Sequence, residues 1–521
     1  MLRLRNGTFA MRLRRLGSGN GEGLARVTQP ATGIDKPQSR FLLAPAGRRE
    51  GLWLAVAVAL LSCLPVLLVE RPQMTDYPSH IARYYIMLDG GQNGWLARYY
   101  DFKWTWSGNL GVDLLIWPMA KLFGLEPAAR IITAIIPPLT GLAMITVEWT
   151  LRRRIGVGTM LAFVTIWSPA LIIGLLNFSL ALALALFAFA AWVRLEQWRW
   201  RWALFVPVAV LVWLCHLAGW GVLGVLVFGY EWHRRRGLRA FLAPWPLALP
   251  VLGFLGGSAP AGMLAYGQNV ANFKLSIWFM ALRDQSWWLD IDTLGLLLVA
   301  FAAAAVLRRC DGRLGWAAVF FALLSLALPR HLGGGDYTDY RLIAVALGVG
   351  CLAIDWVPPR IILWFAPLLY LVRLGMTASA WHADSREVEA MLKALDHVPQ
   401  GARIAAAVVM ERAIWATDTF QHVPTYATIR RDALVNTHFA EPGVHMLQLR
   451  EGGPAFKDPS QRILLSPGEP VDLANFAPAA QADYLWYIGG PTPASLPPGA
   501  VVIFRTKRSL MARLAKAPPA R

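Results

Sequence analysis

Apolar runs long enough to cross a lipid bilayer recur along this chain of 521 residues, and short arginine-rich loops separate many of them. The first run covers residues 52–69, and a helix needs about 20 mostly apolar residues to span the hydrocarbon core. Charged residues make up only 16% of the chain, whereas ordinary soluble domains contain about 25%. The sequence therefore predicts a polytopic α-helical membrane protein.

The positive charge of the chain is explained by the membrane. A net charge of +18 in a soluble protein would suggest a nucleic-acid partner, but here the arginines gather between apolar runs. Cytoplasmic loops of membrane proteins carry an excess of Lys and Arg. We therefore expect the lipid bilayer as a partner, no nucleic acid, and a cytoplasmic side that contains residues 152–154, 234–236 and 308–309.

Alternation of the apolar runs around these loops gives about eleven spans. They are expected at residues 52–69, 128–149, 158–175, 178–195, two short helices within 202–231 that meet near His216, 239–256, 294–307, 314–328, 342–356 and 361–377. The apolar segment 109–124 is short and contains Asp113, so we expect it to lie on the outer surface or to dip in and return.

This topology divides the chain into three parts. Residues 1–50 are expected to form a disordered basic cytoplasmic tail, residues 51–379 the membrane domain, and residues 380–521 a small extracytoplasmic α/β domain. In the last part, the sequence predicts an amphipathic helix at 385–397 and strands at 404–409, 484–488 and 501–505.

The stretch that follows the first span carries an acid, an imidazole and a guanidinium. Asp76 stands where a helix N-cap would stand, and Pro78 favours the first helical turn. On that helix His80 and Arg83 lie near the same face as Asp76. This pattern suits chemistry on an amphiphilic substrate at the membrane surface. It equally suits a capped helix start with a solvated polar face.

Polar residues from distant loops converge on the outer face of this topology. They are Asp76, His80, Arg83, Asn177, His216, Lys274, Arg283, Arg330, His331, Asp336, Asp339 and Arg341. Cations of this kind can hold a phosphate or diphosphate, and an acid can take a proton from an attacking hydroxyl. The alternative for His216 is a hydrogen-bonded packing residue.

Four stretches resemble the GT-C glycosyltransferases, the group containing protein O-mannosyltransferases and lipid A aminoarabinose transferases, and a fifth resembles the outer domains of such bacterial proteins. The stretches are TDYPSHIAR after the first span, NLGVDLLIWPMAKLFGLEPAARI at 109–131, LRRRIG at 151–156, LLNFSLALALALFAFAAWVR at 175–194 and PTYATIRRDALVNTHFAEPGVHML at 424–447. The resemblance implies a bacterial inner-membrane enzyme that uses a polyprenyl-phosphate-linked sugar and a glycan, lipid or protein acceptor outside the cytoplasm.

The resemblance also assigns roles. The first-loop acid of the family is the proposed base or helps to hold a metal, which implies that Asp76 is the catalytic base and leaves a divalent metal open as a cofactor. Tyr77 stands where the common pattern has a second acid, which speaks against the metal. His80, Arg83, His216, Lys274, Arg330, His331, Asp339 and Arg341 are the expected substrate-binding residues.

Two other functions fit the same layout. One is a transporter or flippase of a lipid-linked glycan, although such proteins often place charges inside spans and show internal repeats. Here the charges concentrate in the outer loops and no repeat is visible. The other is a non-catalytic envelope assembly protein whose outer domain binds glycan.

Overall fold

The computed structural model describes residues 41–252, 264–332, 335–411, 414–440, 445–457, 462–465, 469–490 and 492–515. Most of the expected tail 1–50 lies outside the described residues. The chain divides into the units Met1–Phe41 and Leu42–Arg521, and the second unit contains every element discussed below.

Helices dominate the second unit. In the region of the predicted spans they are α2 (Arg48–Leu61), α3 (Leu64–Leu67), α6 (Gly111–Phe123), α7 (Leu125–Arg152), α8 (Val157–Ala162), η1 (Phe163–Thr165), α9 (Pro169–Ile173), α10 (Leu176–Arg194), α11 (Arg201–Cys215), α12 (Leu217–Arg235), α13 (Leu238–Leu242), η2 (Trp245–Leu247), η3 (Leu249–Val251), α15 (Val270–Phe279), α16 (Trp287–Val306), α17 (Gly312–Ala327), α18 (Thr338–Ala353), α19 (Arg360–Phe365) and α20 (Leu368–Leu392).

Five helical stretches among the described residues are long and apolar enough to cross a membrane. They are Arg48–Leu67, Leu125–Arg152, Leu176–Arg194, Trp287–Val306 and Arg360–His397. Three further apolar helices are shorter, namely Val157–Ile173, Arg201–Cys215 and Gly312–Ala327. The chain is thus a helical protein with the features of a membrane protein.

The bundle breaks where the sequence contains polar or proline residues. α11 and α12 meet at His216, whose backbone is extended, as the sequence predicted. The predicted span 158–175 is instead divided into α8, η1 and α9, and Pro169 starts the last piece. The expected span 239–256 was wrong as one helix, because Pro residues that lack an N–H interrupt it and only α13, η2 and η3 form within its described part.

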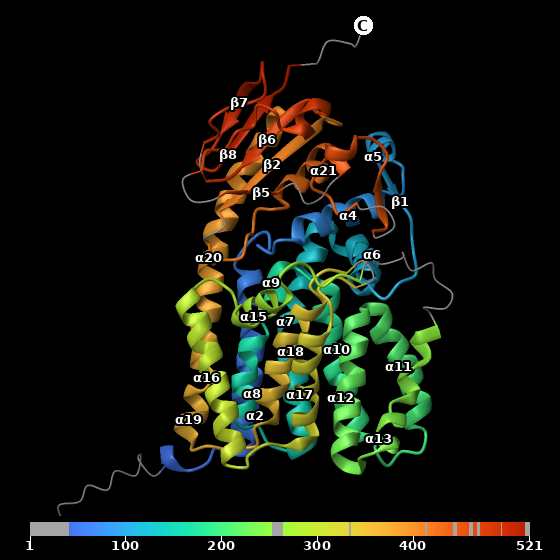
Figure 1. Ribbon diagram of the computed structural model, residues 1–521, viewed down its shortest axis with the longest axis vertical. Coiled ribbons are helices and arrows are strands. Elements are labelled where there is room, and N and C mark those ends of the chain that lie inside the picture. The colour runs from blue at the N-terminus through green and yellow to red at the C-terminus, as the bar shows by residue number, and fades with distance from the viewer. Residues whose placement is uncertain are drawn as a thin grey trace, which may run out of the picture. The chain divides into compact units, whose positions relative to one another are not determined.

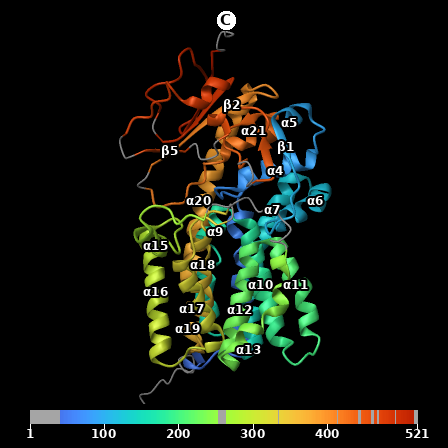
Figure 2. The same cartoon turned by 45° about the vertical axis from the view of Figure 1, so that its right-hand side comes forward.

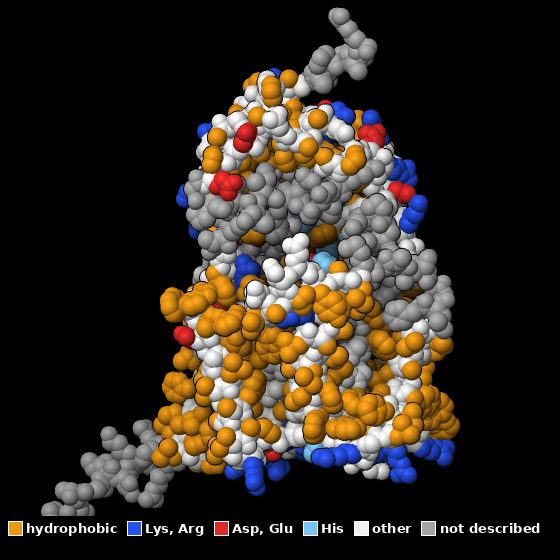
Figure 3. Space-filling model, in the orientation of Figure 1, with side chains coloured by type: hydrophobic (Ala, Val, Ile, Leu, Met, Phe, Trp, Pro, Cys, Tyr) orange, Lys and Arg blue, Asp and Glu red, His pale blue; other side chains and the backbone are white. Residues whose placement is uncertain are grey.

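The helices of the bundle lie side by side, with α16 and α11 at opposite edges in both views (Figures 1 and 2). Apolar side chains cover the visible outer surface of the helices, while Lys and Arg gather along the end opposite the C-terminal sheet (Figure 3). This separation of apolar and basic surface is the arrangement expected of a protein embedded in a bilayer.

A mixed sheet lies at the other end. Its strands are β2 (Arg403–Glu411), β3 (Leu434–Val435), β5 (Arg462–Leu465), β6 (Tyr484–Ile488), β7 (Val501–Arg505) and β8 (Ser509–Arg513), in the order β3-β2-β6-β8-β7, with β5 also paired to β2. β2 runs parallel to β3, β5 and β6, and β8 is antiparallel to its neighbours. The three predicted strands are therefore present.

Both faces of the central strands β2 and β6 are buried, whereas the edge strand β7 is largely exposed. Ile404 and Trp486 point to one face and pack with Met391, just before the end of α20. Ala405 and Leu485 point to the other face, as the two-residue period of a strand requires. That second face packs on residues from α4 (Tyr77–Asp89), α5 (Gly94–Tyr99) and β1 (Tyr100–Phe102), which belong to the first predicted loop.

The junction between bundle and sheet is continuous. α20 runs through residue 380, where the sequence analysis placed the start of the outer domain, and the short η4 (Lys393–His397) follows it. β1 pairs with β4 (Leu447–Leu449), which adds a second connection between the first loop and the C-terminal part. α4 and α9 lie at the end of the bundle nearest this sheet (Figure 1).

Candidate active site

Asp76 is fixed by its backbone at the start of α4. It occupies the N-cap position that the sequence predicted, but its side chain accepts no hydrogen bond from the helix. Its N–H donates to the carbonyl of Ile173 at 2.8 Å. Gly174 follows with φ +109°, and a Cβ there would lie 3.1 Å from the Asp76 Cβ. A residue without a side chain thus lets the end of α9 approach Asp76 closely.

The side chain of Asp76 faces the C-terminal part of the chain. Nε2 of His422 lies 3.8 Å from Asp76 Oδ1, and His422 is completely buried. Nδ1 of His422 is 2.8 Å from the carbonyl of Thr437. Thr75 Oγ1 donates to the carbonyl of Asp418, which fastens the same segment to the first loop. The structure therefore places 418–437 against the residue expected to be the base.

His80 and Arg83 have other partners. His80 stacks on Tyr84, and burial, reinforced by the charge of Arg83, lowers the pKa of His80 to about 3. Arg83 forms an ion pair with Asp113, which is fully buried. Asn177 also donates to Asp113, at 3.2 Å. These contacts tie α4, α6 and α10 together, and they account for the acid in the apolar segment 109–124.

Arg341 and His216 meet near the start of α18. Nδ1 of His216 accepts a hydrogen bond from Ala218 N–H at 3.0 Å and so caps α12. The proton of the neutral ring then lies on Nε2, which is 2.9 Å from Arg341 Nη1. Arginine can only donate, so this contact does not satisfy the guanidinium. His216 therefore caps α12, as expected of a packing residue, and it also lies beside Arg341 of the candidate site.

The guanidinium of Arg341 lacks a carboxylate partner among the described residues. Nη2 donates to the carbonyl of Asp336 at 3.0 Å, and Nε is buried without a hydrogen bond. Asp336 and Asp76 are close enough for their charges to act on it. A partly buried guanidinium with unused donors is a site for an anion.

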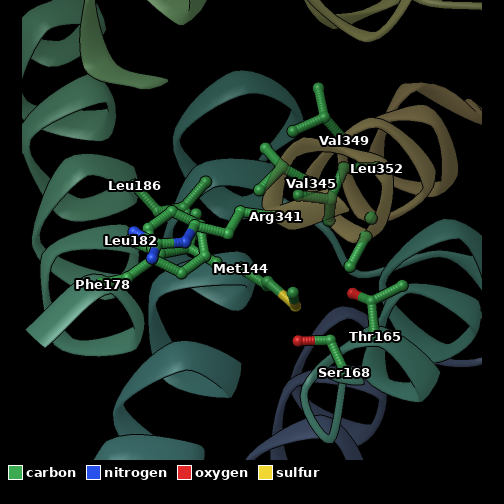
Figure 4. A pocket seen from close by; sticks show the side chains of 12 residues that line it. Met144, Thr165, Ser168, Phe178, Leu182, Leu186, Arg341, Val345, Val349 and Leu352 are labelled. Atoms are coloured by element: carbon green, nitrogen blue, oxygen red, sulfur yellow. The ribbon is translucent and has the colours of Figure 1, made fainter. Parts of the chain in front are cut away.

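Arg341 also lines a small cavity of about 20 Å³ that is partly open. The walls are mainly apolar side chains from α7, α10 and α18, including Met144, Phe178 and Val345. Figure 4 shows Arg341 beside Phe178 on one side, with the hydroxyls of Thr165 and Ser168 directed inward from the other. Apolar walls with one cation fit an amphiphile with a charged head group.

The remaining predicted binding residues are engaged with each other. Nζ of Lys274 lies 2.5 Å from Asp339 Oδ2 and also donates to two backbone carbonyls, so its three donors are used. Both side chains are buried, which makes this pair a connection between α15 and α18. Arg330 forms two hydrogen bonds with Asp336, at 2.9 and 3.2 Å.

His331 lies beside the same carboxylate. Its Nδ1 is 3.3 Å from Asp336 Oδ1, and its side chain is more exposed than most of the site. Arg283 donates to the carbonyls of Trp415 and Ala416 and holds that loop. Among the expected substrate-binding residues that the structure describes, Arg341 and His80 each have a buried nitrogen without a hydrogen-bond partner, and Arg341 is the one that is a cation.

Sequence reasoning missed His422 and Thr437. The stretch 424–447 drew attention only through the family resemblance, and a single histidine in a segment without periodicity carries no local signal. No group of three or more His, Cys, Asp or Glu side chains in the described ranges is arranged to hold a metal ion. The chain matches no known protein-family model, and no curated protein or solved structure is detectably similar to it.

Proposed function

We propose that this protein is a membrane glycosyltransferase that moves a sugar from a polyprenyl-phosphate donor to a glycan, lipid or protein acceptor. One observation carries the proposal: the guanidinium of Arg341 has unused donors, borders an apolar cavity, and lies within electrostatic reach of Asp76. The lipid phosphate would bind Arg341, and the proximal isoprene units would pack on the apolar side chains around this cavity. The acceptor hydroxyl would bind Asp76.

The proposed chemistry needs one base and one cation. The Asp76 carboxylate takes the proton of the acceptor hydroxyl as the acceptor oxygen forms a bond to the anomeric carbon of the sugar. The bond between that carbon and the phosphate oxygen breaks, and the electron pair leaves with the lipid phosphate. The Arg341 guanidinium offsets the negative charge that develops on the leaving oxygen.

We further propose a bacterial inner-membrane location with about eleven spans and the C-terminal α/β domain outside the cytoplasm. The gathering of Lys and Arg at the end opposite the sheet supports this orientation, since such residues favour the cytoplasmic side (Figure 3). The N-terminus is then cytoplasmic, and Asp76 and Arg341 face the outer leaflet.

Reporter fusions test the orientation. A fusion after Ala380 should behave as extracytoplasmic, and a matched fusion after Arg154 should behave as cytoplasmic. An active cytoplasmic reporter after Ala380 would place Asp76 on the side of the membrane where nucleotide sugars are available. That result would contradict the use of a lipid-linked donor.

A transfer assay tests the function. The purified protein in nanodiscs should release polyprenyl phosphate from a set of polyprenyl-phosphate-linked sugars when cell-envelope acceptors are present. Release should require the acceptor and should decrease at subsaturating donor when Arg341 is replaced by Gln. A transporter or a glycan-binding assembly protein would move or bind the lipid without breaking the sugar–phosphate bond, so intact donor across the whole set would refute the proposal.

A further inference from the structure

His422 belongs to the C-terminal part but faces the proposed base. Its Nε2 lies 3.8 Å from Asp76 Oδ1, whereas its Nδ1 lies 2.8 Å from the carbonyl of Thr437. A carbonyl oxygen can only accept, so Nδ1 must carry a proton. In the neutral ring, Nε2 therefore presents a lone pair toward the carboxylate of Asp76.

Two acceptors that face each other need a proton between them. When Asp76 is ionised, a protonated His422 can donate to it. When Asp76 has taken a proton from an acceptor hydroxyl, its O–H can donate to the neutral ring. The separation of 3.8 Å exceeds a normal hydrogen bond by roughly 1 Å, and such contacts often shorten only when substrate is bound.

The segment around His422 is held firmly. Thr75 donates to the carbonyl of Asp418, the carboxylate of Asp418 accepts from Phe420 N–H at 3.0 Å, and Thr419 donates to Asp384 of α20 at 3.0 Å. The ring of Phe439 packs on His422 with a centroid distance of 4.5 Å. These contacts fix the imidazole relative to α4, as a group that orients a base must be fixed.

Other titratable groups lie near His422 and Asp76. His80 from α4 and His438 from its own part of the chain lie within electrostatic reach, and burial lowers the pKa of each to about 3, so both are neutral near pH 7. Asp418 lies four residues before His422 in the chain. Arg341 acts on Asp76 from the side of α18. The carboxylate of Asp76 lies 3.8 Å from Nε2 of this imidazole.

We propose that His422 is a positioning residue that shares one proton with Asp76, so that the C-terminal segment 418–437 completes the active site. This inference rests on the proposed transferase function. Asp76 takes the acceptor proton, and Nε2 of His422 accepts the hydrogen bond of the resulting carboxylic acid. When the lipid phosphate leaves, the proton passes from the pair to solvent or to the departing phosphate.

The first test uses transfer kinetics. His422→Asn keeps an N–H that can donate to Thr437 and removes Nε2. We expect kcat to fall about 10- to 100-fold, the usual cost of losing a partner that orients a site group. The KM of the polyprenyl-phosphate sugar should not change, because Arg341 and the cavity bind it.

The pH profile separates positioning from structural support. If Asp76 and His422 share one proton, the acid limb of the wild-type pH profile reports the pair rather than Asp76 alone. In His422→Asn the acid limb should move to lower pH by about one unit, which is the usual spread of a side-chain pKa among folded proteins. His438→Gln is the matched control, because His438 is equally buried but bonds Thr428. Its acid limb should coincide with that of the wild type.

The second test does not need activity. Thermal unfolding of Asp76→Asn, His422→Asn and the double variant gives the coupling between the two side chains. The coupling is measured at pH 5 and at pH 8 and should differ from zero at one of them at least, because the two side chains lie 3.8 Å apart. If the two side chains are coupled but the protein transfers no sugar, the interaction between Asp76 and His422 stands and the proposed transferase function is refuted. Zero coupling at both pH values, or an unmoved acid limb in His422→Asn, would overturn the pair itself.

Discussion

Asp76→Asn should lower the rate of sugar transfer by about 10²- to 10⁴-fold, the usual contribution of a general base. Asn keeps the size of the side chain but lacks the charge and the basicity that proton removal requires. Donor binding should be unchanged, because the phosphate contacts Arg341 rather than Asp76. The measurement is single-turnover transfer with saturating polyprenyl-phosphate sugar, together with donor affinity for the same preparation.

Asp76→Ala distinguishes the base from a helix cap. A capping aspartate would lose about 1 kcal/mol of stability when replaced by Ala, but the Asp76 side chain accepts no hydrogen bond from α4. We therefore expect the melting temperatures of the Ala and Asn variants to agree at pH 8, with both variants inactive. If the Asn variant transfers sugar at the wild-type rate, Asp76 is a structural residue and not the catalytic base.

Arg341→Gln should weaken binding of the donor by roughly 10- to 150-fold. A hydrogen bond to a charged group contributes about 1.5–3 kcal/mol, and each 1.4 kcal/mol is about tenfold in affinity. Arg341→Lys should recover only part of the loss, because a point charge does not reproduce the fork of a guanidinium. The measurement is equilibrium binding of a polyprenyl-phosphate sugar in nanodiscs.

Arg130→Lys is the matched control for this experiment. Arg130 donates to the carbonyls of Val66 and Leu67 near the end of the first span, and the cavity residues do not include it. The Arg130→Lys protein should bind the donor with the affinity of the wild type. If the Arg341→Gln protein binds the donor as tightly as the wild type, Arg341 is not part of the binding site. The main support for a phosphate-linked donor is then lost.

Several features of the fold were accessible to sequence analysis because they depend on local properties. Apolar length predicted helices that can cross a membrane, and basic residues at both ends of 202–231 predicted the helix break at His216. Short β-like runs predicted three strands of the sheet. Asp76 was correctly placed at a helix start, since Pro78 and an acid are a short-range signal.

The partners of the polar residues were decided by the tertiary structure. Arg83 and Lys274 looked like phosphate ligands in the sequence, but α6 brings Asp113 to the first, and α18 brings Asp339 to the second. Burial of a charge is tolerated when an opposite charge offsets the loss of water, so these pairs form where helices pack. That packing also left Arg341 with unused donors and brought His422 to Asp76. The sequence determined which groups were present near the outer face, and only the packing of distant segments decided which charges were neutralised, because ion pairing depends on separation in space rather than along the chain.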